Sequence, residues 1–347
     1  MGEKRVAILG AGAAGAVTAA WLVQKGCEVI WWDQEEQCRK DFAVIGEKGI
    51  QVEGPGLTSG LRPAVLTYRL EEAMEAERVL VCVSSGRQEE TAALMAPYVK
   101  SNHDLLLIPG NLGSVAVRRV FEKAKAAWGL LAELGECPWA CRRLGPGHYV
   151  SAMPPGEKRI AALGKGRTEE ASHRFGDLFF LRPGAGLAEN CLNSPNVLTH
   201  LPGVLLNLGG IAEKGEGFAL FTDGFSDGYI RCVELLEQER GAVLKRAGME
   251  CYSAPVGPFL TMLRERERHP ELQAFCSLSG PDGLGHRYVT EDASCGMAFL
   301  VSLGRRLGVS MPVTEALFTL AGKLSGTDFY SAGRTLEWLG KDGEDVF

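Results

Sequence analysis

The sequence lacks any long hydrophobic run, and this absence argues against a membrane-spanning helix. A helix needs roughly 18 or more apolar residues in a row to cross a bilayer. The first apolar stretch, from Val6, is already broken by Gly10, Gly12 and Gly15, which is not typical of a secretory leader. We therefore expect a cytoplasmic protein that makes no membrane contact.

An excess of basic residues is also missing. Lysines and arginines number 37 against 43 aspartates and glutamates, which gives a net charge of −6. This balance does not provide the broad positive surface that nucleic-acid binding requires. Small molecules are the expected partners, and nucleic acids are not.

The ten cysteines lack a recognisable pattern. No Cys-x-x-Cys pair and no repeated metal-ligand spacing occurs among them, so we expect neither a metal site nor a disulfide framework. Reduced thiols in the core agree with a cytoplasmic location.

The chain is long enough for two domains, because 347 residues exceed the size at which a single core usually keeps growing. Short apolar runs alternate with helical stretches in the first half, which predicts an α/β Rossmann-type domain with a doubly wound parallel sheet over residues 1–185. The second half, residues 186–347, predicts an all-α helical-bundle domain that binds the substrate. The expected strands are Arg5–Leu9, Glu28–Trp32, Val79–Val83 and Asp104–Ile108, with Lys158–Leu163 and Phe179–Leu181 at the far edge, and the expected second-domain helices are Pro195–Ala212, Asp227–Ala247, Thr290–Leu307 and Pro312–Leu324.

A glycine motif, Gly10-Ala11-Gly12-Ala13-Ala14-Gly15, follows the first strand and opens a helix. In this context the Gly-x-Gly-x-x-Gly pattern predicts a dinucleotide site, because N–H groups at the helix start can face a diphosphate. The alternative is a glycine turn that only permits close packing.

Asp33 ends the next expected strand, 23 residues after Gly10. A carboxylate there accepts hydrogen bonds from the adenine ribose and repels a 2′-phosphate, so NAD is favoured over NADP. Arg39 and Lys40 could serve a phosphate instead, although solvated helix charges are the simpler interpretation. Pro109, in the loop after a later strand, is expected to wall the nicotinamide pocket.

The second domain has a polar helix face. After the helix start at Ser194-Pro195, Asn196, His200 and Asn207 fall on one face, apart from an apolar stripe. Pro202 should kink this helix because it lacks a backbone donor. Such a face can line a cleft, but a packed core or surface histidine explains His200 as well.

A second candidate segment lies near residue 290. Thr290 is expected to cap a helix, with Glu291 and Asp292 in its first turn. Acids at that position stabilise a helix through its dipole. Asp292 therefore has a structural interpretation beside a functional one.

Taken together, these segments resemble the opine dehydrogenase family, of the octopine and nopaline dehydrogenase type. The resemblance rests on the order of motifs over nearly the whole chain: Ala7–Gly12, Glu53–Gly56, Ile108–Asn111, Ala140–Arg142, Asn193–Asn207, Tyr288–Asp292 and Gly333–Gly340. It implies reductive condensation of a 2-oxo acid with an amino acid, dependent on NAD(P)H, to a secondary amine dicarboxylate, or the reverse reaction. A homodimer is compatible with it.

The resemblance also implies site residues. A histidine and a later aspartate form the catalytic pair of the family, and an arginine shortly before the aspartate helps to hold a substrate carboxylate; the matching positions are His200, Asp292 and Arg287. Asn196 is a further candidate for substrate binding. The sequence departs from the family where Leu201 precedes Pro202, and where Ala293-Ser-Cys295 replaces Ile/Val-Pro.

Two other functions stay open. A ketopantoate-type reductase of 2-oxo acids resembles the first domain, but it relies on a helix lysine that Pro195–Ala212 does not contain. A non-catalytic NAD-binding regulatory protein would bind NAD tightly without turnover.

Overall fold

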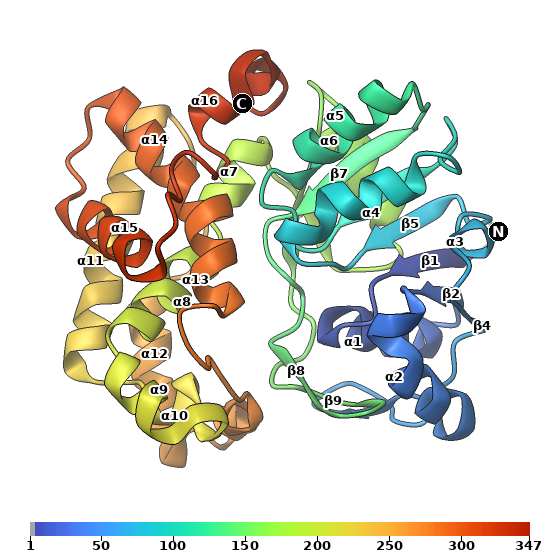
Figure 1. Ribbon diagram of the computed structural model, residues 1–347, viewed down its shortest axis with the longest axis horizontal. Coiled ribbons are helices and arrows are strands. Elements are labelled where there is room, and N and C mark those ends of the chain that lie inside the picture. Colours follow the sequence, from blue (N-terminus) through green and yellow to red (C-terminus); the bar gives the residue numbers. More distant parts are fainter. Residues whose placement is uncertain (1–3) are drawn as a thin grey trace. The chain divides into compact units, whose positions relative to one another are not determined.

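The computed structural model describes residues 4–347 and divides into two compact units, Met1–Leu187 and Ala188–Phe347 (Figure 1). The division predicted from the sequence, between residues 185 and 186, lies close to this one. The first unit holds the strands of the main sheet, and the second is built from helices.

An eight-stranded sheet, in the order β11-β10-β7-β6-β5-β1-β2-β4, forms the centre of the first unit. All neighbours from β4 to β7 are parallel. The parallel doubly wound sheet that the sequence predicted is present, and at its far edge, where additions were expected, β10 runs antiparallel to β7. No crossover helix lies between these two strands, whereas a parallel return is usually made through one. The strands are β1 (Arg5–Leu9), β2 (Glu28–Trp32), β4 (Val65–Thr67), β5 (Arg78–Val81), β6 (Asp104–Leu107), β7 (Leu130–Leu134), β10 (Lys158–Ala162) and β11 (Leu181–Pro183).

A small three-stranded sheet accompanies the large one. It consists of β3 (Gln51–Glu53), β9 (His148–Ser151) and β8 (Cys141–Gly145), with β8 and β9 antiparallel. The sequence analysis did not predict it, because such short strands carry little hydrophobic periodicity.

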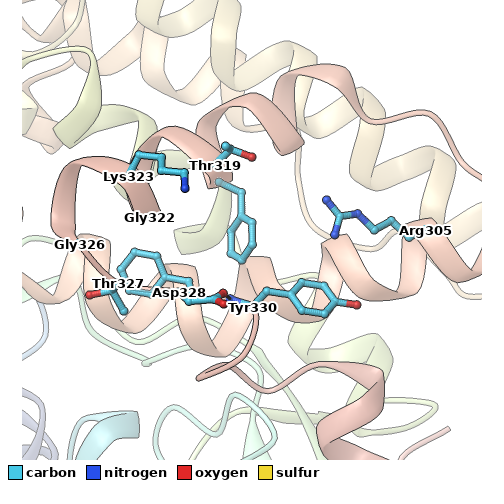
Figure 2. Close-up of a pocket in the computed structure, with 10 residues that line it drawn as sticks. Arg305, Thr319, Gly322, Lys323, Gly326, Thr327, Asp328 and Tyr330 are labelled. Atoms are coloured by element: carbon cyan, nitrogen blue, oxygen red, sulfur yellow. Dashed lines mark hydrogen bonds between the residues drawn. The ribbon is translucent and has the colours of Figure 1, made fainter.

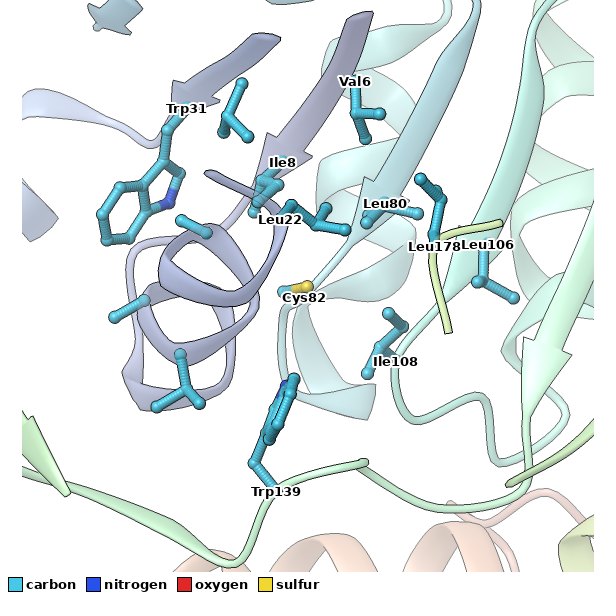
Figure 3. Close-up of a cluster of buried hydrophobic side chains, with 14 of the residues drawn as sticks. Val6, Ile8, Leu22, Trp31, Leu80, Cys82, Leu106, Ile108, Trp139 and Leu178 are labelled. Carbon is cyan, nitrogen blue, oxygen red and sulfur yellow. The ribbon is translucent and has the colours of Figure 1, made fainter. Parts of the chain in front are cut away.

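Side chains from one face of the large sheet form a cluster of buried hydrophobic residues in the first unit (Figure 3). Val6, Ile8, Leu80 and Leu106 are fully buried there. Small side chains of α1 (Ala13–Gln24) let that helix pack closely against β1 and β2. The other helices of this unit are α2 (Glu35–Lys48), α3 (Leu70–Ala73), α4 (Gln88–Met95), α5 (Gly113–Ala124) and α6 (Thr168–Phe175).

The second unit is a bundle around the long helix α11 (Asp227–Ala247), whose bounds are as predicted. Ser226 caps its start by accepting a hydrogen bond from the N–H of Tyr229, and Gly248 ends it at φ +72°. None of the helices in residues 4–347 is both long and apolar enough to span a membrane. The others are α7 (Leu187–Leu192), α8 (Asn196–Leu205), α9 (Leu208–Lys214), α10 (Leu220–Asp223), α12 (Val256–Arg264), α13 (Arg287–Glu291), α14 (Ala298–Leu307), α15 (Pro312–Ser325) and α16 (Leu336–Leu339).

Two helix predictions need correction. The single helix expected over Pro195–Ala212 is divided into α8 and α9, with Asn207 outside both. The helix expected from Thr290 begins at Arg287 instead, because the ring of His286 accepts a hydrogen bond from the backbone of Tyr288 and caps it.

Candidate active site

The turn between β1 and α1 has the shape of a dinucleotide loop. Gly10 adopts φ +112°, and a Cβ there would lie 2.5 Å from the carbonyl oxygen of Cys82. A Cβ at Gly15 would lie 2.0 Å from the carbonyl oxygen of Gly10, whereas one at Gly12 would meet nothing within 4 Å. The first and third glycines therefore allow the turn to close, and the exposed Gly12 leaves room for a ligand to approach the backbone.

The start of α1 supplies the donors for this loop. Gly12 is the N-cap, so the N–H groups of Ala13, Ala14 and Gly15 lie in the first turn, where a helix has no internal acceptors for them. These groups and the helix dipole fit a diphosphate. The N–H of Ala11 has another role, because it donates to Asp33 Oδ2 at 2.7 Å.

Asp33 follows β2 and is buried, with 3% of its surface exposed. Its Oδ1 accepts a hydrogen bond from the backbone N–H of Gln34 at 2.8 Å and lies 3.5 Å from Nη2 of Arg87. Each carboxylate oxygen can accept more than one hydrogen bond, so the contact with Ala11 leaves Oδ2 with capacity for a ribose hydroxyl. Arg39, which the sequence offered as a phosphate ligand, pairs with Glu35 instead.

Hydrogen bonds from buried side chains hold the loop Pro109–Gly113, which is predicted to line the nicotinamide pocket. Leu112 has φ +63°, a conformation that costs energy for a residue with a Cβ. The buried carboxylate of Glu133 offsets this cost by accepting hydrogen bonds from the N–H of Leu112 at 3.0 Å and of Ser114 at 2.6 Å. Gln88 Nε2 donates to the carbonyl oxygens of the first two loop residues, each at 3.1 Å.

His200 and Asp292 meet in the second unit, 92 positions apart in sequence. His200 Nδ1 lies 2.7 Å from Asp292 Oδ2, and the two side chains are each 8% exposed. The contact joins α8 to the segment that follows α13. With Nδ1 held by the carboxylate, proton transfer to or from a substrate would fall to Nε2.

Burial raises the pKa of Asp292 to about 7, and the nearby guanidinium of Arg287 opposes the rise. A positive charge on the imidazole would stabilise the carboxylate through the same contact, so the protonation states of the two groups are coupled. A group of this kind near neutral pH suits acid–base work.

The local backbone around Asp292 is unusual. Residues Asp292–Met297 form a π-helix between α13 and α14, and such insertions often occur at functional sites. This is the segment in which Ala293-Ser-Cys295 replaces the family pattern. The carbonyl oxygen of Ser294 accepts a hydrogen bond from the N–H of Arg334 at 2.8 Å, which ties the C-terminal motif to the π-helix.

The remaining predicted residues differ in their surroundings. Arg287, half-exposed, lies 3.9 Å from Glu291 and 5.3 Å from the ring centroid of Tyr288. Asn196 is the first residue of α8 and is partly buried. Asn207 donates hydrogen bonds to two backbone carbonyls at the end of α8 and in the turn after α10, so its role is packing.

A cavity of about 480 Å³ lies elsewhere in this unit (Figure 2). Side chains of α14, α15 and the turn after α15 line it, among them Arg305, Lys323 and Tyr330. His200, Asp292 and Arg287 are not part of its lining. Residues 4–347 contain no group of three or more side chains suited to a metal ion.

The sequence analysis missed the partners that orient these groups. Arg87, beside Asp33, lies in a short 3-10 turn, and Glu133, beneath the loop, lies in β7. Both are distant in the chain from the groups they contact, so no local sequence signal indicates them. Tyr288 stacks on His200; it precedes Asp292 by one helical turn, and that spacing could have placed it near the pair.

Comparisons with known proteins give one match in each half of the chain, with limits close to the boundary of the two units. Residues 183–325 match the family described as NAD/NADP octopine/nopaline dehydrogenase, alpha-helical domain. Residues 6–164 match the family of ketopantoate reductase PanE/ApbA.

Relatives match over nearly the whole chain. An opine dehydrogenase of Arthrobacter sp. (strain 1C) is 29% identical, with 98% of this chain and 96% of the relative covered. A vitopine synthase of Allorhizobium ampelinum is 24% identical, with 99% and 97% covered. A solved octopine dehydrogenase with NADH and L-arginine has a TM-score of 0.66 at 19% identity, with 97% and 95% covered.

The fold, the glycine turn and these matches define an NAD(P)-dependent oxidoreductase with an N-terminal NAD-binding α/β domain and a C-terminal helical domain. Within that class, the chain is similar to opine dehydrogenases of the octopine and nopaline type over nearly its whole length. The predicted fold class and the predicted resemblance are confirmed.

Proposed function

We propose that the protein is an opine-dehydrogenase-like enzyme that condenses a 2-oxo acid with the amino group of an amino acid and reduces the product with NADH. The observation that carries the proposal is the buried contact of His200 Nδ1 with Asp292 Oδ2 at 2.7 Å. It lies in the unit that matches the helical domain of the octopine/nopaline dehydrogenases.

His200 has the chemistry that this reaction needs. Carbonyl addition and loss of water each require a proton to be given or taken, and imidazole does both near neutral pH. We assign these transfers to Nε2, since Nδ1 is engaged by Asp292. Asp292 then fixes the tautomer and stabilises the imidazolium.

Arg287 and Asn196 are proposed to bind substrate. A guanidinium can hold a carboxylate with two parallel hydrogen bonds. Arg287 is half-exposed at the start of α13, so its side chain can reach a ligand. Its positive charge also keeps Asp292 more acidic than burial alone would.

The glycine turn and Asp33 are proposed to hold the cofactor. The N–H groups of Ala13, Ala14 and Gly15 suit the diphosphate, and the carboxylate of Asp33 favours NAD over NADP. When bound, the reduced nicotinamide supplies the hydride. The overall reaction converts one 2-oxo acid, one amine, NADH and a proton into the secondary amine, NAD⁺ and water.

The alternative is a ketopantoate-type reductase, which would reduce the 2-oxo acid without an amine. The match to that family covers residues 6–164 in the nucleotide-binding unit. The helical unit, which would choose the substrate, matches the octopine/nopaline family instead.

We also propose a cytoplasmic location, consistent with ten cysteines that remain free thiols.

The decisive experiment measures NADH oxidation over a grid of 2-oxo acids (glyoxylate, pyruvate, 2-oxoglutarate) against amino acids, with mass analysis of the products. We expect turnover only when both substrates are present. The product mass should equal the sum of the two substrates minus water plus two hydrogens. Oxidation of NADH by the oxo acid alone, at the same rate, would establish the reductase instead, and NADH binding without turnover on any pair would establish the regulatory protein.

A further inference from the structure

Tyr288 lies flat against the imidazole of His200. The ring centroids are 3.5 Å apart and the ring planes differ by 13°. Only 1% of Tyr288 is exposed, so solvent does not separate the rings. Tyr288 and Asp292 are four residues apart, so one segment presents both the aromatic face and the carboxylate to the same imidazole.

Other groups hold the tyrosine ring in place. His286 packs edge-on against it, with centroids 4.6 Å apart and planes at 88°. The guanidinium of Arg287 lies 5.3 Å from its centroid. His286 also caps α13, so the same residue starts the helix and supports the ring.

We propose that Tyr288 is a positioning residue, which fixes the plane of the His200 ring and stabilises its protonated form. This inference rests on the proposed function for its catalytic meaning, but the ring contact exists without it. The hydrogen bond to Asp292 holds one edge of the imidazole. The parallel ring of Tyr288, in van der Waals contact with the face of the imidazole, restricts rotation of the ring about that bond and so aims Nε2 in one direction.

The stack also acts on charge. An aromatic face attracts a cation through its quadrupole, so the contact favours the imidazolium over the neutral ring. The titratable groups around the stacked rings are His286, Arg287 and Glu291 at α13, Asp292 and Cys295 on the π-helix, and Tyr229 on α11, whose hydroxyl donates to the carbonyl of Thr199.

The test is a pH titration of the histidine rings by NMR on the ¹⁵N-histidine-labelled full chain, without substrate. The chain has six histidines, and His200→Gln identifies the signal. We expect Tyr288→Leu to lower the titration midpoint of His200 by about 0.5–1 unit, because the cation–π contribution is lost. Tyr288→Phe should retain the wild-type midpoint, since the ring remains. Tyr330→Leu, which removes a ring that contacts Arg305 instead, is the matched control.

A second measurement uses the wild-type protein and does not depend on the Tyr288 variants folding. Protons of an imidazole stacked on a tyrosine face are shifted upfield, so the ring signals of His200, assigned with His200→Gln, should lie upfield of those of the exposed His173. An unshifted His200 signal, or an unchanged midpoint in a folded Tyr288→Leu protein, would overturn the positioning role. The substrate grid fails or succeeds separately, because these measurements need no turnover.

Discussion

Asp292 is a carboxyl group whose protonation changes within the physiological range. Burial raises its pKa from the ordinary 3.8 to about 7. A group with a raised pKa in the folded state favours folding most below its ordinary value, and this contribution is lost as the pH rises through about 7.

We therefore predict that Asp292→Asn changes stability in a pH-dependent way. The Tm of the wild type minus that of the variant should fall by about 2–6 °C between pH 5 and pH 8, which corresponds to roughly 1–2 kcal/mol in a unit of this size. Thermal unfolding followed by circular dichroism at several pH values measures it. A difference that is constant, or that grows with pH, would refute the buried-carboxyl assignment.

Arg87 is the cation that lies beside Asp33, the carboxylate proposed to bind the adenine ribose. It is 3.5 Å from Asp33 and about one-third exposed, at 32%, so it can turn toward a ligand. We predict that Arg87→Ala widens the preference for NADH over NADPH by about 10-fold, because one charge-assisted contact to the 2′-phosphate is lost. Fluorescence titration gives both Kd values. Arg39→Ala, at a side chain that is 73% exposed and paired with Glu35, should leave the ratio unchanged; equal effects of the two variants would exclude a special role for Arg87.

At the level of elements, the turn between β1 and α1 separates packing from ligand binding. We predict that Gly12→Ala keeps the wild-type Tm but weakens NADH binding at least about 10-fold, since its Cβ meets no protein atom and enters the space of the diphosphate. Gly15→Ala should lower both the Tm and the affinity for NADH, because its Cβ would lie 2.0 Å from a backbone oxygen. Calorimetric NADH titration and thermal unfolding distinguish the two. Tight NADH binding by a folded Gly12→Ala protein would place the diphosphate elsewhere.

Helices were predictable where local signals agree. α11 has a serine cap at one end and glycine at the other, and its predicted bounds were correct. The prediction of one helix over α8 and α9 was wrong because the helix breaks after Leu205 and not at Pro202. At the break, Asn207 donates hydrogen bonds to two backbone carbonyls. The π-helix at Asp292–Met297 has no periodic signature, so the sequence could not indicate it.

At the level of the whole molecule, the glycine turn and the strand–helix alternation were sufficient to predict the fold class. They could not predict the antiparallel β10, because strand direction depends on the path of the connection and not on the pattern of the strand. The pairing of His200 with Asp292 was expected only through the family resemblance. Neither spacing nor composition joins residues so far apart in the chain.

The two functions assigned to the two units can be separated in one variant. If the first unit holds NADH and His200 performs proton transfer, loss of the imidazole should affect chemistry alone. The most direct measurement compares NADH affinity and steady-state turnover of His200→Ala with those of the wild type, on the substrate pair that the grid identifies. The account predicts a fall in kcat of at least about 100-fold, as for loss of a general acid–base group, with the NADH Kd unchanged within about 2-fold. A variant that still turns over at a rate close to the wild type, or one that no longer binds NADH, would contradict it.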